Sequence, residues 1–247
     1  MVRAPEFPGD IDWINSRPLW MPDLRGKFVL LDFWTYCCIN CLHILPELKR
    51  LEREFARELV VIGVHSAKFH NERQTEQIRQ AVSRLGIEHP VMNDAAFQLW
   101  QTYVIRAWPT VVLINPEGGI IGSMAGENIY PPISTMLRDA IPYFEAKGSL
   151  DRSPLELSSE PDVESVLAYP GKVIADEASG RIFLSDTNHN RILVLKASGQ
   201  VLDVIGSGEE GRAEGSFGHA KLNRPQGMAL AGSRLYIADT ENHLIRC

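Results

Sequence analysis

The sequence lacks the features that mark several large protein classes. Its 247 residues carry four cysteines, three of them within five positions, so the spread of cysteine pairs that a disulfide-stapled fold needs is missing. There is no run of lysines and arginines, and the net charge is −6, which excludes a basic patch for nucleic acid or for an anionic membrane surface. We therefore expect no nucleic-acid partner and no membrane partner.

Long apolar segments are also absent. No stretch approaches about 18 uninterrupted apolar residues, the length that a membrane-spanning helix needs. The N-terminus has no apolar segment followed by a small-residue cleavage site. From these absences we expect a cytoplasmic protein. Its 45% hydrophobic and 23% charged residues are ordinary for a globular chain, long enough for one large domain or two modest ones.

The first 148 residues alternate between strand and helix patterns. An apolar run at 27–34 is typical of a strand buried on both faces, and residues 59–64 repeat that pattern. Between them, apolar residues recur every three or four positions from Leu42 to Phe55, which predicts an amphipathic helix. Strand, helix and strand in this order predict a parallel crossover unit.

Further elements complete an α/β sandwich with a mixed sheet. Asn93 or Asp94 is placed to cap one of the helices. A turn at 115–118 predicts an antiparallel hairpin. The expected elements are helices at about 71–85, 95–103 and 133–146, and strands at 110–114 and 119–124.

The second half of the chain has a different pattern. Residues 149–165 are polar and rich in Ser and Pro, which predicts a linker. From 166 to 247 the pattern is all strand, and the segments 180–195 and 233–246 resemble each other. Asp186 aligns with Asp239 at an offset of 53 residues, a period that predicts propeller blades. We expect these acids to hydrogen-bond the turn that follows them rather than to bind calcium.

Only one blade and most of a second fit into this region, whereas a closed propeller needs at least about four. The sequence also stops at Cys247 inside a segment that reads as a strand. We therefore expect an incomplete propeller from a truncated chain, partly ordered or self-associating through its exposed strand edges.

Cysteine chemistry centres on the sequence Cys38-Ile39-Asn40-Cys41, at the expected helix start. Exchange of thiols and disulfides needs one cysteine that is readily a thiolate and a second that expels the mixed disulfide. A helix N-terminus stabilises the first, and the second follows one turn later. We assign Cys38 as the nucleophile and Cys41 as the resolving thiol.

Two further residues fit this chemistry. Asp32 lies in a strand that should be buried, where a carboxyl without a basic partner has a raised pKa and can accept a proton from the resolving thiol. Trp108-Pro109-Thr110 opens a strand, an arrangement expected if Pro109 is cis and faces the cysteine pair, leaving its neighbour's backbone free for an extended substrate.

The stretch LLDFWTYCCINC, with WPT further along, resembles the thioredoxin superfamily, and the insertion between Val64 and Trp108 resembles its TlpA/redoxin branch. The tail resembles NHL repeats. Together with GVHSAKF and DTENHLIR, the whole chain resembles the thioredoxin-domain NHL-repeat-containing protein family. The resemblance implies a thioredoxin-like α/β fold at 1–148, a linker at 149–165, and an incomplete all-β NHL propeller segment at 166–247.

The same resemblance implies a thiol-disulfide oxidoreductase acting on protein disulfides and dithiols. Cys38, Cys41, Asp32 and Pro109 fall on the family's nucleophile, resolving cysteine, buried acid and cis proline. A redox-active Cys38–Cys41 disulfide would serve in place of any cofactor or metal, and the propeller of the full-length protein would bind a protein partner. The chain departs from the superfamily at Cys37, where Trp is usual, and at Ile39-Asn40, where Gly-Pro is common.

Several alternatives stay open. The first domain is either this enzyme or a catalytically weak scaffold beside an interaction propeller. A peroxidase is a minor alternative, because Thr35 lies three residues before Cys38 as in peroxiredoxins, although Leu31 stands where that pattern has proline. Three simpler alternatives involve no catalysis: the thiols bind zinc, Asp32 has only a structural role, or Pro109 is trans.

Four residues are candidates for substrate contact, although packing also explains each of them: Trp34, Tyr36, Cys37 and Trp108. Cys37 is either an incidental thiol or a third redox thiol able to trap Cys38.

Overall fold

The computed structural model describes residues 2–155, 157 and 165–247. The chain divides into two compact units, residues 1–161 and 162–247. Within the predicted linker, residues 156 and 158–164 lie outside the described residues. Its first part is tied to the first unit, because the Asp151 N–H donates to Gly26 O (2.9 Å) and Lys27 Nζ donates to Ser153 O (2.7 Å).

A six-stranded mixed sheet forms the centre of the first unit, in the order β1-β4-β3-β2-β5-β6. The pairs β2–β3 and β3–β4 are parallel, and the other three pairs are antiparallel. Its strands are β1 (Trp13–Ile14), β2 (Phe28–Trp34), β3 (Leu59–His65), β4 (Val91–Asn93), β5 (Thr110–Ile114) and β6 (Ile120–Ala125). Strand β2 therefore lies between β3 and β5, and every one of its residues is buried.

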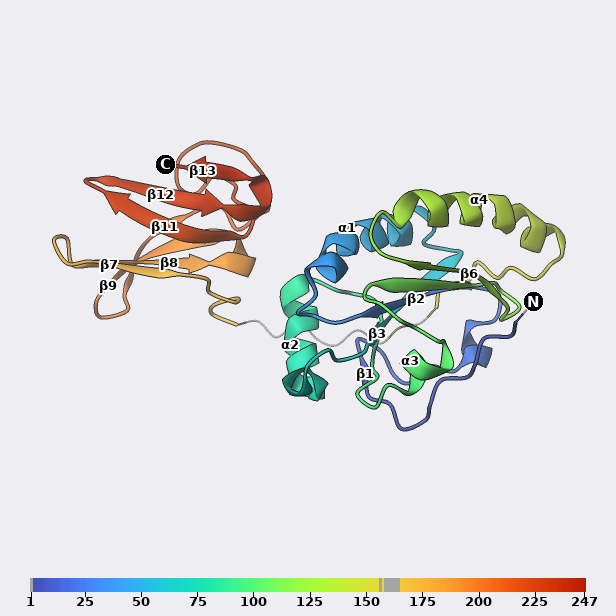
Figure 1. Ribbon diagram of the computed structural model, residues 1–247. Helices are drawn as coiled ribbons and strands as arrows, with labels where there is room; N and C mark the ends of the chain where they lie inside the picture. The colour runs from blue at the N-terminus through green and yellow to red at the C-terminus, as the bar shows by residue number, and fades with distance from the viewer. Residues whose placement is uncertain (1, 156, 158–164) are drawn as a thin grey trace. The chain divides into compact units, whose positions relative to one another are not determined.

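Helices cover both faces of this sheet. Helices α1 and α4 lie on one side and α3 on the other (Figure 1), and each side has its own apolar cluster against β2. Even-numbered residues of β2 such as Leu30 face α1 and α4, whereas odd-numbered ones such as Leu31 face the N-terminal segment and α3. The helices are α1 (Ile39–Glu54), α2 (Thr75–Leu85), α3 (Gln98–Thr102) and α4 (Tyr130–Ala146), with 3-10 turns at Met21–Leu24 and His70–Arg73.

The structure confirms the strand–helix–strand unit and the hairpin, and it corrects several boundaries. The helix expected at 71–85 begins at Thr75, because His70–Arg73 forms a separate 3-10 turn. The helix expected at 95–103 is shortened to α3, but Asp94 still caps it by accepting hydrogen bonds from the N–H groups of Leu99 (3.0 Å) and Trp100 (2.9 Å). The short strands β1 and β4 were not predicted.

Antiparallel sheets make up the second unit. A four-stranded sheet has the order β10-β9-β8-β7, and a three-stranded sheet has the order β11-β12-β13. Phe183 and Ile192 from the first sheet share one apolar cluster with Ile237 from the second. The strands are β7 (Val173–Asp176), β8 (Arg181–Asp186), β9 (Arg191–Lys196), β10 (Val201–Ile205), β11 (Pro225–Ala231), β12 (Arg234–Asp239) and β13 (Leu244–Arg246), with 3-10 turns at Thr187–His189 and Thr240–Asn242.

The two repeat acids hold equivalent turns, as predicted. Asp186 Oδ2 lies 2.8 Å from both His189 Nδ1 and Arg191 Nε, and Oδ1 accepts the Ala168 N–H (2.7 Å). Asp239 accepts hydrogen bonds from Asn242 Nδ2 (2.8 Å) and from the Asn223 N–H (2.7 Å). Both carboxylates are buried and fully engaged, so each fixes the end of one strand to the turn that starts the next.

Replacing Asp186 with Ala should therefore destabilise the second unit. The change leaves the Arg191 guanidinium and the Ala168 N–H without their acceptor, which costs about 2–4 kcal/mol in the free energy of unfolding. Urea unfolding followed by circular dichroism measures the loss. Asp203→Ala, at an exposed position on β10, is the matched control and should change stability by less than about 0.5 kcal/mol. Equal stability of the two variants would contradict the bracing role of Asp186.

Candidate active site

The two cysteines of the predicted pair lie at the start of α1. Cys38 is the residue before the first helical turn, with an extended backbone, and its carbonyl accepts the N–H groups of Cys41 (3.0 Å) and Leu42 (3.2 Å). Their side chains are hydrogen-bonded to each other, and all four cysteines of the chain are free thiols. Cys38 is half-buried and Cys41 is fully buried, so an incoming disulfide reaches Cys38 first.

Burial raises the pKa of the Cys41 thiol, and its hydrogen bond with Cys38 and the charge of Asp32 add to the rise. A thiol in this position is a poor nucleophile until a base removes its proton. Cys38, in contrast, is half-buried and lies just before the first helical turn. The two sulfurs therefore have different environments although they are neighbours.

Asp32 is a buried carboxyl close enough to Cys41 for its charge to affect that thiol. It lies in the centre of β2, opposite Gly63 of β3, and it is only 1% exposed. Neither of its carboxylate oxygens has a hydrogen-bond partner. Burial raises its pKa to about 7, and the charge of His89 acts in the opposite direction. A carboxyl with this pKa gains and loses a proton near neutral pH, as a general base must.

Trp34 does not lie where it could contact a substrate. It is 1% exposed and points to the same face of β2 as Asp32, where its ring packs edge-on against His65. A Cβ added at Gly63 would lie 3.0 Å from Trp34 Nε1, tighter than an ordinary contact, so the absence of a side chain at Gly63 leaves room for the indole. The predicted substrate contact is therefore wrong for Trp34, which is a core residue beneath the thiols.

Tyr36 is half-buried and stacks on His65, with ring centroids 5.3 Å apart. Its backbone N–H donates to His65 Nε2 (3.4 Å). Burial lowers the pKa of His65 to about 4, so this imidazole stays neutral and acts as a hydrogen-bond acceptor at neutral pH. His65 thus holds the loop that carries the cysteines.

The Trp108–Pro109 bond is cis, as expected from the sequence. Thr110, the next residue, pairs with Phe33 in β2, so this bond lies at the end of β2 that leads into the cysteines. Trp108 is half-buried, packs against the same apolar cluster as Cys38 and Cys41, and donates its indole N–H to Ser66 O (3.0 Å). The structure therefore brings Trp108, both thiols and Asp32 to one end of the sheet.

Sequence analysis missed Glu72. This acid belongs to the 3-10 turn His70–Arg73, is 2% exposed, and hydrogen-bonds with the Cys37 thiol. The segment around it is polar and has no periodicity, so no sequence signal marks Glu72 as buried. Cys37 itself is exposed, as one of its predicted roles requires.

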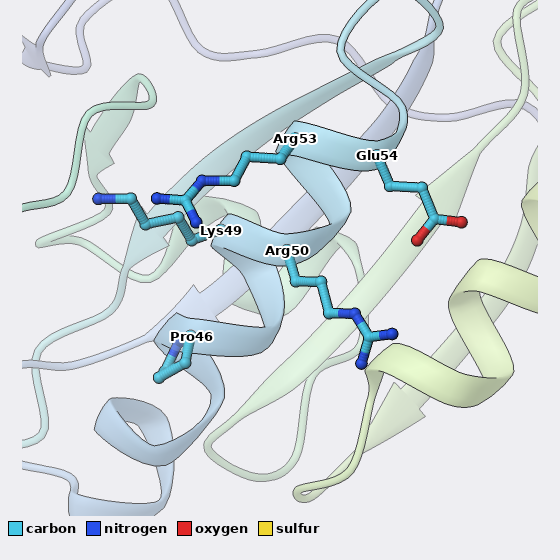
Figure 2. A pocket seen from close by; sticks show the side chains of 5 residues that line it. All are labelled: Pro46, Lys49, Arg50, Arg53 and Glu54. Carbon is cyan, nitrogen blue, oxygen red and sulfur yellow. The ribbon is translucent and has the colours of Figure 1, made fainter.

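A surface hollow on α1 is not part of this site. It is lined by Pro46, Lys49, Arg50, Arg53 and Glu54, which all project from α1 (Figure 2). The Arg50 guanidinium lies 3.6 Å above the ring of Tyr130, and Glu54 pairs with Arg138. These contacts join α1 to α4, so the charged residues of the hollow have a structural role.

Family models match both units. A thioredoxin-like model matches residues 26–120, and an NHL-repeat model matches residues 222–247. A solved thiol-disulfide isomerase from Corynebacterium glutamicum has a similar fold, with a TM-score of 0.50 and 25% identity over 55% of this chain and 95% of its own. The predicted thioredoxin-like fold, followed by antiparallel strands of a partial NHL propeller, is confirmed.

Two curated relatives are similar to the chain over nearly its whole length. Protein SUPPRESSOR OF QUENCHING 1, chloroplastic, from Arabidopsis thaliana is 46% identical over 255 residues, which cover 99% of this chain and 24% of the relative. NHL repeat-containing protein 2 from Bos taurus is 42% identical over 251 residues, which cover 99% of this chain and 35% of the relative. The chain thus spans only about a quarter to a third of the length of these relatives.

The buried Asp32 predicts an unusual pH dependence of stability. Its pKa is about 7 in the folded domain and 3.8 in an exposed chain, so between these values the folded state holds a proton that the unfolded state has released. Stability therefore falls as pH rises through this window and stays low above it. Asp32→Asn removes the charge, and at pH 8 we expect a gain of roughly 1–4 kcal/mol in the free energy of unfolding.

Urea titrations at pH 4, 6 and 8 measure this gain, which should shrink toward pH 4. The exposed Asp139→Asn on α4 is the control and should show no such trend. An Asp32→Asn variant less stable than the parent at pH 8 would show that the ionised carboxylate is satisfied in the fold.

Proposed function

The chain belongs to the family of proteins that join a thioredoxin-like domain to NHL repeats, and from this premise we propose that its first domain is a thiol-disulfide oxidoreductase acting on protein disulfides. One observation carries the proposal. A half-buried thiol at a helix N-terminus is hydrogen-bonded to a fully buried one, and a carboxyl with a pKa of about 7 lies near the second thiol.

In the first step, the Cys38 thiolate attacks one sulfur of a substrate disulfide. A bond forms between Cys38 Sγ and that sulfur, the substrate S–S bond breaks, and the released substrate thiolate takes up a proton. The product is a mixed disulfide. The cis bond at Pro109 lies at the same end of the sheet, and we assign it the role of aligning an extended substrate segment beside Cys38.

In the second step, Asp32 accepts the proton of Cys41. The Cys41 thiolate then attacks Cys38 Sγ, the Cys38–Cys41 disulfide forms, and the second substrate thiolate leaves. Two electrons have passed from the protein dithiol to the substrate. An external dithiol reductant closes the cycle by reducing the Cys38–Cys41 disulfide, so the redox-active disulfide is the only redox group that this mechanism uses.

The peroxidase alternative has less support. In that mechanism the threonine hydroxyl would hydrogen-bond the reactive cysteine, but Thr35 Oγ1 donates to Glu72 Oε2 (2.8 Å).

An interaction role for the NHL region is a second candidate function. It is favoured by the match of an NHL-repeat model to residues 222–247. We propose that the full-length protein binds a protein partner through its propeller while the thiols act on disulfides.

The cytoplasmic location remains a prediction. Among the described residues, no helix is long and apolar enough to cross a membrane. One relative carries the word chloroplastic in its name, so the cytoplasmic location of this chain is not confirmed.

Insulin reduction with dithiothreitol as the electron donor tests the assignment of the two cysteines. Cys38→Ser should reduce turnover to the uncatalysed rate, because the attacking sulfur is lost. Cys41→Ser should accumulate a mixed disulfide on Cys38, visible by mass spectrometry as an insulin-chain adduct. Cys247→Ser, at the last residue of the chain, should retain activity. Full turnover by Cys38→Ser would rule out the mechanism.

The second step should depend on the protonation of Asp32. A mixed disulfide between Cys38 and glutathione can be preformed, and the release of glutathione followed in a stopped-flow instrument. Because the base works only when ionised, we expect the rate to rise as pH passes through about 7. Asp32→Asn should slow release at pH 8 by roughly 10- to 100-fold and remove this inflection. An unchanged pH profile in Asp32→Asn would exclude Asp32 as the base.

A further inference from the structure

A third thiol lies directly beside the nucleophile. Cys37 precedes Cys38 in the chain and is exposed, so a substrate or an oxidant that reaches Cys38 also reaches Cys37. The Cys37 thiol hydrogen-bonds with the buried Glu72, which comes from the 3-10 turn after β3. The mechanism above uses neither residue.

The contacts of Glu72 fix its carboxylate as an acceptor. Its Oε2 atom accepts hydrogen bonds from Thr35 Oγ1 (2.8 Å) and from the backbone N–H groups of Lys68 (3.0 Å) and Phe69 (3.1 Å). Burial disfavours the charge, but hydrogen bonds from Cys37, Thr35 and these two N–H groups outweigh it, and the pKa of Glu72 is lowered. Glu72 therefore stays ionised and is a poor base.

The hydrogen bond that helps to lower the pKa of Glu72 raises the pKa of Cys37. Desolvation and the hydrogen bond to the Glu72 carboxylate raise the pKa of Cys37 to about 11. Thr35, whose Oγ1 lies 4.0 Å from Cys37 Sγ, and the charge of Lys68 oppose this rise without cancelling it. The phenol of Tyr36, the neutral imidazole of His65 and the charge of Arg84 are further ionisable groups at this loop.

A free thiolate at Cys37 would compete with Cys41. In the mixed disulfide it could attack Cys38 Sγ, expel the substrate thiolate and form a disulfide between neighbouring residues, while Cys41 kept its proton. We propose that Glu72 is a positioning residue that holds Cys37 as a protonated hydrogen-bond donor and so reserves the resolution of the mixed disulfide for Cys41. This inference rests on the proposed exchange activity.

The two buried carboxyls beside the cysteines, Asp32 and Glu72, thus have opposite roles in this proposal. Asp32 has no hydrogen-bond partner and accepts a proton from Cys41, whereas Glu72 has several donors and leaves the proton on Cys37. The difference selects which thiol becomes a nucleophile in the second step.

The rate of Cys37 alkylation by iodoacetamide between pH 6 and 11 tests this proposal. In the 247-residue chain with Cys38→Ser, Cys41→Ser and Cys247→Ser, Cys37 is the only thiol. Its reaction rate should keep rising past pH 10. Adding Glu72→Gln keeps an acceptor for Thr35 but removes the charge, and it should raise the rate at pH 8 by roughly 10- to 100-fold. Glu76→Gln, which removes an exposed charge on α2, is the matched control and should leave the rate unchanged.

A midpoint near 8.5 for Cys37 in the protein with native Glu72 would overturn the proposal, because that is the value of an ordinary thiol. This measurement uses native Glu72, so it tests the proposal even if the Glu72→Gln variant misfolds. With all four cysteines present, oxidation by glutathione disulfide should yield Cys38–Cys41 in the parent and a several-fold larger share of Cys37–Cys38 in Glu72→Gln. An equal share in both proteins would also overturn it.

Alkylation reports on Cys37 without any exchange reaction. A shifted Cys37 profile in a protein that fails to reduce insulin would therefore refute the proposed function, whereas insulin reduction with an ordinary Cys37 profile would refute only the role of Glu72.

Discussion

A carboxyl group buried without a hydrogen-bond partner is the constraint on which this site depends. Asp32 lies in the central strand β2, between β3 and β5, where neither of its oxygens has a hydrogen-bond partner and the charge of His89 offsets its desolvation only in part. An ionised carboxylate is costly in such a place, so the group binds a proton up to about neutral pH. The sheet therefore places a carboxyl that titrates near neutral pH close to the buried Cys41 thiol, whose proton we propose that it accepts.

Cysteine reactivity in this loop is set by position rather than by residue type. Three thiols lie within five residues, yet one is at a helix N-terminus, one is buried near Asp32, and one is hydrogen-bonded to Glu72. A helix N-terminus favours the thiolate, whereas burial and an adjacent carboxylate favour the thiol. We propose that these different surroundings give three chemically identical thiols different roles, so that a third cysteine does not disturb a two-thiol mechanism.

Local patterns predicted those parts of the fold and site that depend on short segments. The buried run of β2, the leucine spacing of α1, the cysteines at the helix start and the cis bond at Pro109 all lie within single elements, and the structure has them as expected. Features that depend on long-range contacts escaped prediction. Glu72 is buried because Thr35, 37 residues away, donates to it, and Trp34 is a core residue because Gly63 on the next strand leaves room for its ring. The two-residue strand β1 exists only through its pairing with β4.

A direct titration of the Asp32 carboxyl in the reduced protein tests the central claim most simply. Carbon-13 NMR of the side-chain carboxyl, assigned by its absence in Asp32→Asn, reports the protonation state between pH 3 and 9 without any substrate. A midpoint near 7 would agree with the buried, unpartnered carboxyl described above. A midpoint near 4 would mean that the fold stabilises the charged form, and Asp32 could not then serve as the base for Cys41.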